Sequence, residues 1–253
     1  MTRRHVVQRL HPVLTEVLNS LEGSPLGQAF KDRAVELATS QLLAEPVDRA
    51  AALPAHLWLL EHAAGDGLPL TAVGYLKPAG VRELAAVLPA MQDWPFGLAK
   101  EVDAHPVLRF RGYVTAVGLL RRHKRTLRLT KAGSAARQDP AQLWQHLRDT
   151  LVPRAAPFEE TTGVVMLVHA ATSAEDIDVD AVARTMTELG WSLHDGSPVE
   201  ASDVYPVWNE LWDALGNVGT SVTSSVFDRA LSPAARSLVA DALFEVVDDG
   251  TDR

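Results

Sequence analysis

Nine positively charged side chains gather in one stretch of the chain. Between Ala104 and Gln138 there is no acidic residue, whereas the stretch holds nine of the 24 Lys and Arg residues. They are Arg109, Arg111, Arg121, Arg122, Lys124, Arg125, Arg128, Lys131 and Arg137. A guanidinium engages two phosphate oxygens at once, and phosphate neutralisation releases counterions. The cluster therefore indicates contact with nucleic acid through residues 105–137.

Two other interpretations of this cluster stay open. It is a solvated surface, or it is the internal electrostatic partner of acidic residues elsewhere in the chain. Charge is unevenly distributed, because residues 1–154 carry a net +6 and residues 155–253 a net −14. This split favours a protein scaffold in which the acidic C-terminal half contacts a basic partner or the basic half of another copy. The overall charge of −8 also weakens nonspecific affinity for DNA.

The elements that must position the cluster follow from apolar spacing and from proline and glycine. Residues 54–67 predict a helix closed by a glycine turn, residues 68–71 a short strand, and residues 78–89 a second helix between two prolines. Residues 106–118 place Val107, Phe110, Val114 and Val117 on one face of a third helix, which Gly118 ends. A further helix begins near Thr130 and is broken at Pro140.

A basic hairpin is predicted over residues 119–130. Leu127 and Leu129 share the inward face of its second strand, which leaves Arg122, Lys124 and Arg128 largely exposed. In the nucleic-acid hypothesis Arg121, Arg122, Lys124 and Arg125 hold phosphates, while Arg109 and Arg111 on the third helix approach the groove.

This order of elements carries a family resemblance. The stretch GLLRRHKRTLRLTKAG resembles the wing and following helix of MarR-like winged-helix proteins. The longer stretch from LPLTAVGYLKPAGVREL through LTKAGSAARQDPAQLWQHL resembles an uncharacterised actinobacterial winged-helix-like family, sometimes joined to a plasmid ORF-3-like domain. The resemblance extends over residues 55–245 and implies a fold but no particular activity. The segment Pro89–Ala104 is longer than a tight helix-turn-helix corner of about 3 to 4 residues.

The predicted fold class is mainly α with a short β-hairpin, as tandem winged helix-turn-helix-like units after an N-terminal helical arm. The arm spans residues 1–52, with one helix from Val6 to Leu21 and another from Pro25 to before Pro46. The first unit spans 53–154. Residues 155–253 predict a degenerate second unit of four helical segments, the last running through FEVV, with residues 217–230 in place of the wing. The motifs LTAVG, LTKAG and LSPAA suggest an internal repeat in which a hydroxyl side chain lies at or near a helix start.

The sequence contains no recognisable motif for catalysis, metal binding or cofactor binding. Cysteine is absent, and no G-x-S-x-G, Walker or G-x-G-x-x-G motif occurs, so no catalytic residue, metal ligand or cofactor is predicted and the protein is expected not to be an enzyme. Asp176, Asp178 and Asp180 imitate a calcium loop, but Ala181 and Thr187 stand where glycine and glutamate are needed. These aspartates are expected to cap the helix that starts near Val179.

The remaining expectations concern location and packing. The longest apolar run, Val164–Val168, is far below the roughly 20 residues of a membrane span, and no export signal is recognised, so a cytoplasmic protein is expected. His169 is expected to be a satisfied core residue. A stripe of bulky side chains at helical spacing favours core packing over a protein-partner anchor. It comprises Tyr205, Trp208, Leu211, Trp212 and Leu215.

Overall fold

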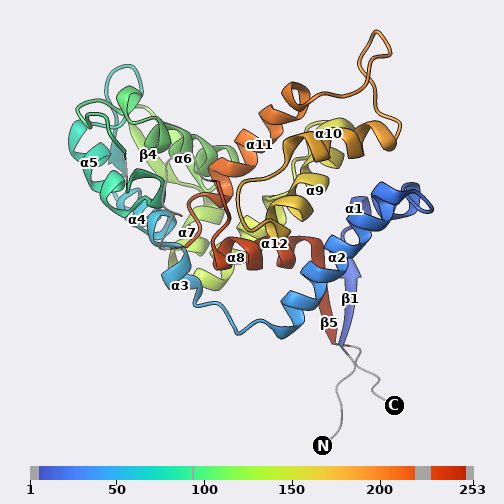
Figure 1. The fold of residues 1–253 in the computed structure, drawn as a ribbon. Coiled ribbons are helices and arrows are strands. Elements are labelled where there is room, and N and C mark those ends of the chain that lie inside the picture. The colour runs from blue at the N-terminus through green and yellow to red at the C-terminus, as the bar shows by residue number, and fades with distance from the viewer. Residues whose placement is uncertain (1–5, 93, 220–228, 249–253) are drawn as a thin grey trace, which may run out of the picture. The chain divides into compact units, whose positions relative to one another are not determined.

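The computed structural model describes residues 6–92, 94–219 and 229–248 (Figure 1). In these residues the protein is mainly helical, with two small antiparallel sheets. The chain divides into two units, each built from separated segments. Unit 1 comprises residues 1–45, 151–208 and 236–253, and unit 2 comprises residues 46–150 and 209–235.

Unit 1 is organised around helix α9 (Pro157–Thr172), which is buried from Thr162 to Ala171. A helix that is apolar all round must be enclosed. Helices α1 (Pro12–Ser20), α2 (Pro25–Leu43) and α10 (Val179–Glu188) pack against α9. The unit also contains the first part of α11 (Ala201–Leu215), most of α12 (Pro233–Leu243) and a two-stranded sheet of β1 (Val6–Leu10) and β5 (Phe244–Asp248).

The β1–β5 pair corrects the sequence prediction at both ends of unit 1. Residues 6–10 were expected to begin the first helix and Phe244–Val247 to end the last, whereas both segments are strands with Leu10 opposite Phe244. Pro12 disfavours a helical conformation at His11, which has φ −54° and ψ 136°. The backbone polar groups of each strand are satisfied by a partner from the other end of the chain, which local periodicity cannot reveal.

Unit 2 follows the predicted order of elements. Helix α3 (Arg49–Ala52) is followed by α4 (Pro54–His62), β2 (Leu68–Pro69), α5 (Pro78–Val87), α6 (His105–Ala116), β3 (Leu120–His123) and β4 (Thr126–Leu129). Two 3-10 turns, η1 (Pro89–Met91) and η2 (Glu101–Asp103), lie in the long connection between α5 and α6. Helices α7 (Lys131–Gln138) and α8 (Pro140–Thr150) complete the first segment, and the three strands pair in the order β2, β4, β3.

Hydroxyl side chains of the repeated motifs accept backbone hydrogen bonds. Thr130 Oγ1 accepts from Gly133 N at 3.0 Å at the start of α7, and Ser232 Oγ accepts from Ala235 N at 3.0 Å at the start of α12. Thr71 Oγ1 accepts from Tyr75 N at 3.1 Å, within a turn rather than at a helix start. The predicted cap at α10 is confirmed, because Asp178 Oδ1 accepts from Ala181 N at 2.9 Å.

The division into units does not coincide with the predicted ranges 1–52, 53–154 and 155–253. Helices α9 to α12 lie where four helical segments were expected. Residues 209–235, however, belong to unit 2, where Gly219 N donates to Ala52 O at 2.7 Å. Of the loop expected to replace a second wing, residues 220–228 lie outside the described part of the chain. No helix among the described residues is long and apolar enough to cross a bilayer.

Candidate nucleic-acid interface

The predicted basic hairpin is present as β3 and β4. Leu120 pairs with Leu129 and His123 with Thr126, so that Lys124 and Arg125 form the turn between them. Leu120 and Leu127 are buried and Leu129 is half-buried, which anchors one face of the hairpin in unit 2. The apolar face thus holds the turn in place and leaves its tip to solvent.

Four cationic side chains surround the tip and are exposed: Arg121, Arg122, Lys124 and Arg125. Among the described residues none of the four forms an ion pair. Like charges this close repel one another in the absence of a counter-charge. The hairpin therefore presents a concentration of positive charge that the rest of the described structure does not neutralise.

Lys124 adopts a backbone conformation that is unusual for its type. Its φ is +54°, and it is the one described non-glycine residue with positive φ. Such a conformation at the first turn position is normally left to Gly, Asn or Asp. A lysine at this point costs backbone energy and gains a charge at the extreme tip of the hairpin.

Arg122 joins the hairpin to the turn that follows β2. A Cβ atom on Gly74 would lie only 2.5 Å from Arg122 Nη1, so the guanidinium covers this glycine. Gly74 has φ +95° and donates its N–H to Thr71 O at 3.0 Å. The absence of a side chain at residue 74 therefore lets the Arg122 guanidinium approach the backbone of the turn.

Arg128 is half-buried, and not largely exposed as predicted. Its Nη2 donates to Asp66 O at 3.3 Å, and its Cγ would be 2.8 Å from a Cβ on Gly67. Strand alternation places Arg128 on the face opposite Leu127, and there it contacts Asp66 and Gly67, which lie just before β2. Arg128 is consequently a packing residue of the sheet.

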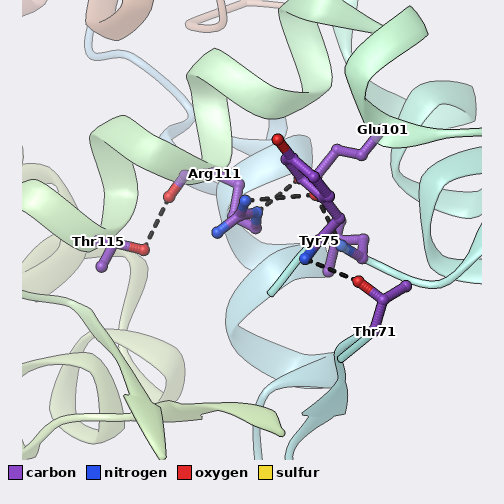
Figure 2. A network of polar contacts seen from close by, with 6 residues as sticks. Thr71, Tyr75, Glu101, Arg111 and Thr115 are labelled. Carbon is purple, nitrogen blue, oxygen red and sulfur yellow. Dashed lines mark hydrogen bonds and ion pairs between the residues drawn. The ribbon is translucent and has the colours of Figure 1, made fainter. Parts of the chain in front are cut away.

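Arg111 is held by a buried carboxylate, and not directed toward a groove as the sequence suggested. Arg111 Nε donates to Glu101 Oε1 at 2.5 Å and Nη2 to Oε2 at 3.2 Å (Figure 2). The Glu101 side chain is 0% exposed and that of Arg111 is 14% exposed. Glu101 Oε2 also accepts from Leu76 N at 2.6 Å, which ties η2, α6 and the turn after β2 together. Such a buried pair holds its elements in register, because removal of one partner leaves the other charge uncompensated.

Arg109 is engaged on the outer face of α6. Its Nε donates to Asp213 Oδ1 at 2.7 Å and its Nη2 to Asn209 O at 2.8 Å. Burial raises the pKa of the Asp213 carboxyl more than the Arg109 guanidinium lowers it. Burial, reinforced by Asp213, likewise raises the pKa of Tyr113 one helical turn further on. Arg109 was expected to contact a ligand, but its guanidinium is bonded instead to Asn209 and Asp213.

The two remaining members of the cluster differ. Lys131 is exposed at the start of α7, whereas Arg137 Nη1 pairs with Glu61 Oε2 at 2.9 Å. The sequence did not identify Glu101 as the buried partner of Arg111. Glu101 lies just before the acid-free stretch, but nothing in its spacing indicates that its side chain points inward toward Arg111.

The described residues do not assemble a candidate metal centre. No three His, Asp or Glu side chains among them lie close enough to hold a metal ion. His56 and His169 are both buried, and burial lowers the pKa of His56 to about 3 and that of His169 to about 4. His169 was expected to be a core residue with all its hydrogen bonds formed. It is buried, but its Nε2 has no hydrogen-bond partner in the described structure.

Comparison with known proteins yields no family model, curated protein or solved structure that matches this chain. The resemblance to winged-helix families therefore stays a prediction from the sequence motifs.

Proposed function

We propose that residues 54–129 form a winged helix and that its β3–β4 hairpin binds the phosphate backbone of nucleic acid. The order helix, strand, helix, helix, strand, strand and the sheet order β2, β4, β3 support the winged-helix assignment. The observation that carries the binding proposal is the hairpin tip, where four exposed cationic side chains lie together without an ion-pair partner among the described residues. Phosphates supply the missing counter-charge.

The proposal is for backbone contact rather than base reading. Arg109 and Arg111 are occupied by Asp213 and Glu101, so the arginines of α6 are not available to base edges. Phosphate contacts position a protein on nucleic acid but carry no sequence information. Binding should therefore depend weakly on sequence and steeply on salt.

Salt-dependent binding of the triple variant Arg121/Lys124/Arg125→Gln tests this proposal. With a fluorescent duplex, anisotropy should show that the slope of log K against log salt falls by about 0.9 for each phosphate that the variant no longer neutralises. Arg122 is kept because its guanidinium packs on Gly74. The affinity at low salt should fall by about tenfold or more.

A matched control separates location from total charge. Lys31/Arg49/Arg82→Gln removes three exposed charges far from the hairpin in sequence and gives the same net charge as the triple variant. The control should retain the salt slope of the unmodified protein. If both triple variants weaken binding equally, or if the unmodified protein does not bind, the hairpin proposal fails.

A second function is favoured by an exposed acidic segment in unit 1. Glu175, Asp176, Asp178 and Asp180 are all exposed, and they complement the hairpin in charge. This arrangement supports head-to-tail self-association, in which the hairpin of one copy meets the acidic segment of the next. The protein then serves as a scaffold.

Light scattering without nucleic acid distinguishes the two functions. Self-association should appear at low salt, disappear at high salt, and be abolished in the variant Glu175→Gln with Asp176→Asn and Asp180→Asn. Asp178 is left in place because it caps α10. This acidic variant should bind nucleic acid normally, and a strict monomer at both salt concentrations would exclude the scaffold.

A further inference from the structure

An open hollow lined by aromatic rings lies in the connection between α5 and α6. It has a volume of about 450 Å³ and is lined by Trp94, Phe96, Gly97, Val102, Asp103 and His105. Pockets of about 300 to 1,000 Å³ are typical of small-ligand sites. None of the cationic residues of the hairpin contributes to this lining.

The aromatic rings present their faces at angles to one another. The Trp94 and Phe96 ring centroids are 5.2 Å apart with an interplanar angle of 68°, and the His105 ring lies 6.3 Å from Trp94 at 39°. Phe96 is 65% exposed although phenyl rings are normally enclosed. A partial cage of rings around an open space leaves π faces available to a ligand.

Charge decides which ligand suits this cage. Asp103 is exposed and forms no ion pair with any described residue, and the described lining contains no Lys or Arg. Aromatic faces attract cations, most strongly when the cation is large and weakly hydrated. A phosphate-bearing ligand would find a carboxylate here and no Lys or Arg.

We propose that this hollow binds an alkylated ammonium group, with Trp94 and Phe96 contacting its methyl groups and Asp103 supplying the counter-charge. The site is independent of the hairpin, since it shares no residue with it. A quaternary ammonium cannot donate a hydrogen bond, so recognition depends on ring faces and on charge. Trimethylated lysine in a peptide and free choline are two sources of the same group.

Binding of tetramethylammonium, measured by ligand-observed NMR and calorimetry, tests the site. Choline should bind at least about tenfold more tightly than its neutral isostere 3,3-dimethylbutan-1-ol, because only the cation gains from the rings and from Asp103. A trimethyllysine peptide that binds more tightly than choline identifies a protein source, and the reverse order identifies a small molecule. Either order supports the proposal.

Two variants assign the binding to this hollow. Phe96→Leu keeps an apolar side chain but removes a ring, and Asp103→Asn removes the charge; each should weaken binding about fivefold or more. Both residues are exposed, so folding should be retained, and Glu36→Gln removes an exposed charge on α2 as the control. Equal binding of the alcohol and choline, no saturable binding of tetramethylammonium, unchanged affinity in both variants, or preferential binding of guanosine monophosphate would each overturn the proposal.

Discussion

At the scale of single residues, Lys124 affects the hairpin in two ways. Its backbone conformation lowers the stability of the turn, and its side chain adds a positive charge. A side chain at φ +54° is strained relative to glycine, whereas the lysine charge serves binding. We predict that Lys124→Gly and Lys124→Ala weaken nucleic-acid binding equally. Only the glycine variant relieves the strain, so it should be about 1 kcal/mol more stable than the alanine variant.

Urea unfolding and anisotropy on the same two variants check this prediction. Equal stabilities would show that the tip relaxes without cost, and unequal affinities would show that Lys124 acts through backbone shape rather than through charge.

His56 makes unit 2 sensitive to acid. It is fully buried, neither ring nitrogen has a partner in the described structure, and its ring lies edge-on to Phe110 at 4.8 Å. Burial lowers the pKa of His56 to about 3 from 6.5. Below pH 6.5 His56 becomes protonated in the unfolded chain but stays neutral in the folded protein. The free energy of unfolding therefore falls as the pH falls toward 3.

Replacement of His56 by leucine should remove this contribution. Between pH 7 and pH 5 the unmodified protein should lose about 2 kcal/mol more stability than His56→Leu, because the unfolded state alone is protonated in that range. His194→Gln changes an exposed histidine and should behave like the unmodified protein. Chemical unfolding at several pH values measures the difference, and parallel curves for all three proteins would contradict the prediction.

At the scale of elements, two helical glycines of unit 2 differ in whether their surroundings leave room for a side chain. A Cβ on Gly133 in α7 would lie 2.0 Å from Leu119 O, whereas a Cβ on Gly112 in α6 would meet nothing within 4 Å. Gly133→Ala should therefore destabilise by about 2 kcal/mol or more, because backbone must move. Gly112→Ala should stabilise α6 by about 0.5 to 1 kcal/mol.

Thermal and urea unfolding report both effects. Gly112→Ala also places a methyl group on the exposed face of α6, and it should leave nucleic-acid binding unchanged if only the hairpin contacts phosphate. Weakened binding in this variant would indicate that α6 itself approaches the nucleic acid.

At the scale of the whole chain, Gln41 in unit 1 joins β1 to α12 and β5, which lie far apart in the sequence. Gln41 Nε2 donates to Asp241 Oδ1 at 2.9 Å and to Phe244 O at 3.0 Å, and Gln41 Oε1 accepts from Gln8 Nε2 at 2.8 Å. One amide on α2 thus bonds to β1, α12 and β5. Such a network contributes more than a surface hydrogen bond.

We predict that Gln41→Ala lowers the free energy of unfolding by about 2 kcal/mol and speeds hydrogen exchange in β1 and β5. Gln28→Ala is the matched control, because Gln28 lies on the same helix and its side chain bonds to Asp32 only four residues away. The control should change stability by less than about 0.5 kcal/mol. Equal effects of the two variants would show that the closure of unit 1 does not depend on Gln41.

Local sequence determined much of this protein. The helix α5 between Pro78 and Pro89, the Asp178 cap of α10 and the β3–β4 hairpin all follow from spacing, proline placement and hydroxyl or carboxylate caps. The exposure of Arg121, Arg122, Lys124 and Arg125 was predictable too, because these residues lie in and around a turn whose strands each contribute apolar residues to one face. These features depend on neighbours within a few residues, which the sequence displays directly.

Only the tertiary structure decided which charges are paired and which ends meet. Arg109 and Arg111 belong to the same cluster as the hairpin arginines, yet Asp213 and Glu101 occupy them. Residues 6–10 form a strand because residues 244–248 lie beside them. In each case the packing of helices and loops brings the partner residue or strand into contact. A buried charge needs an opposite charge and a strand needs a hydrogen-bonded neighbour, so these partners determine the structure.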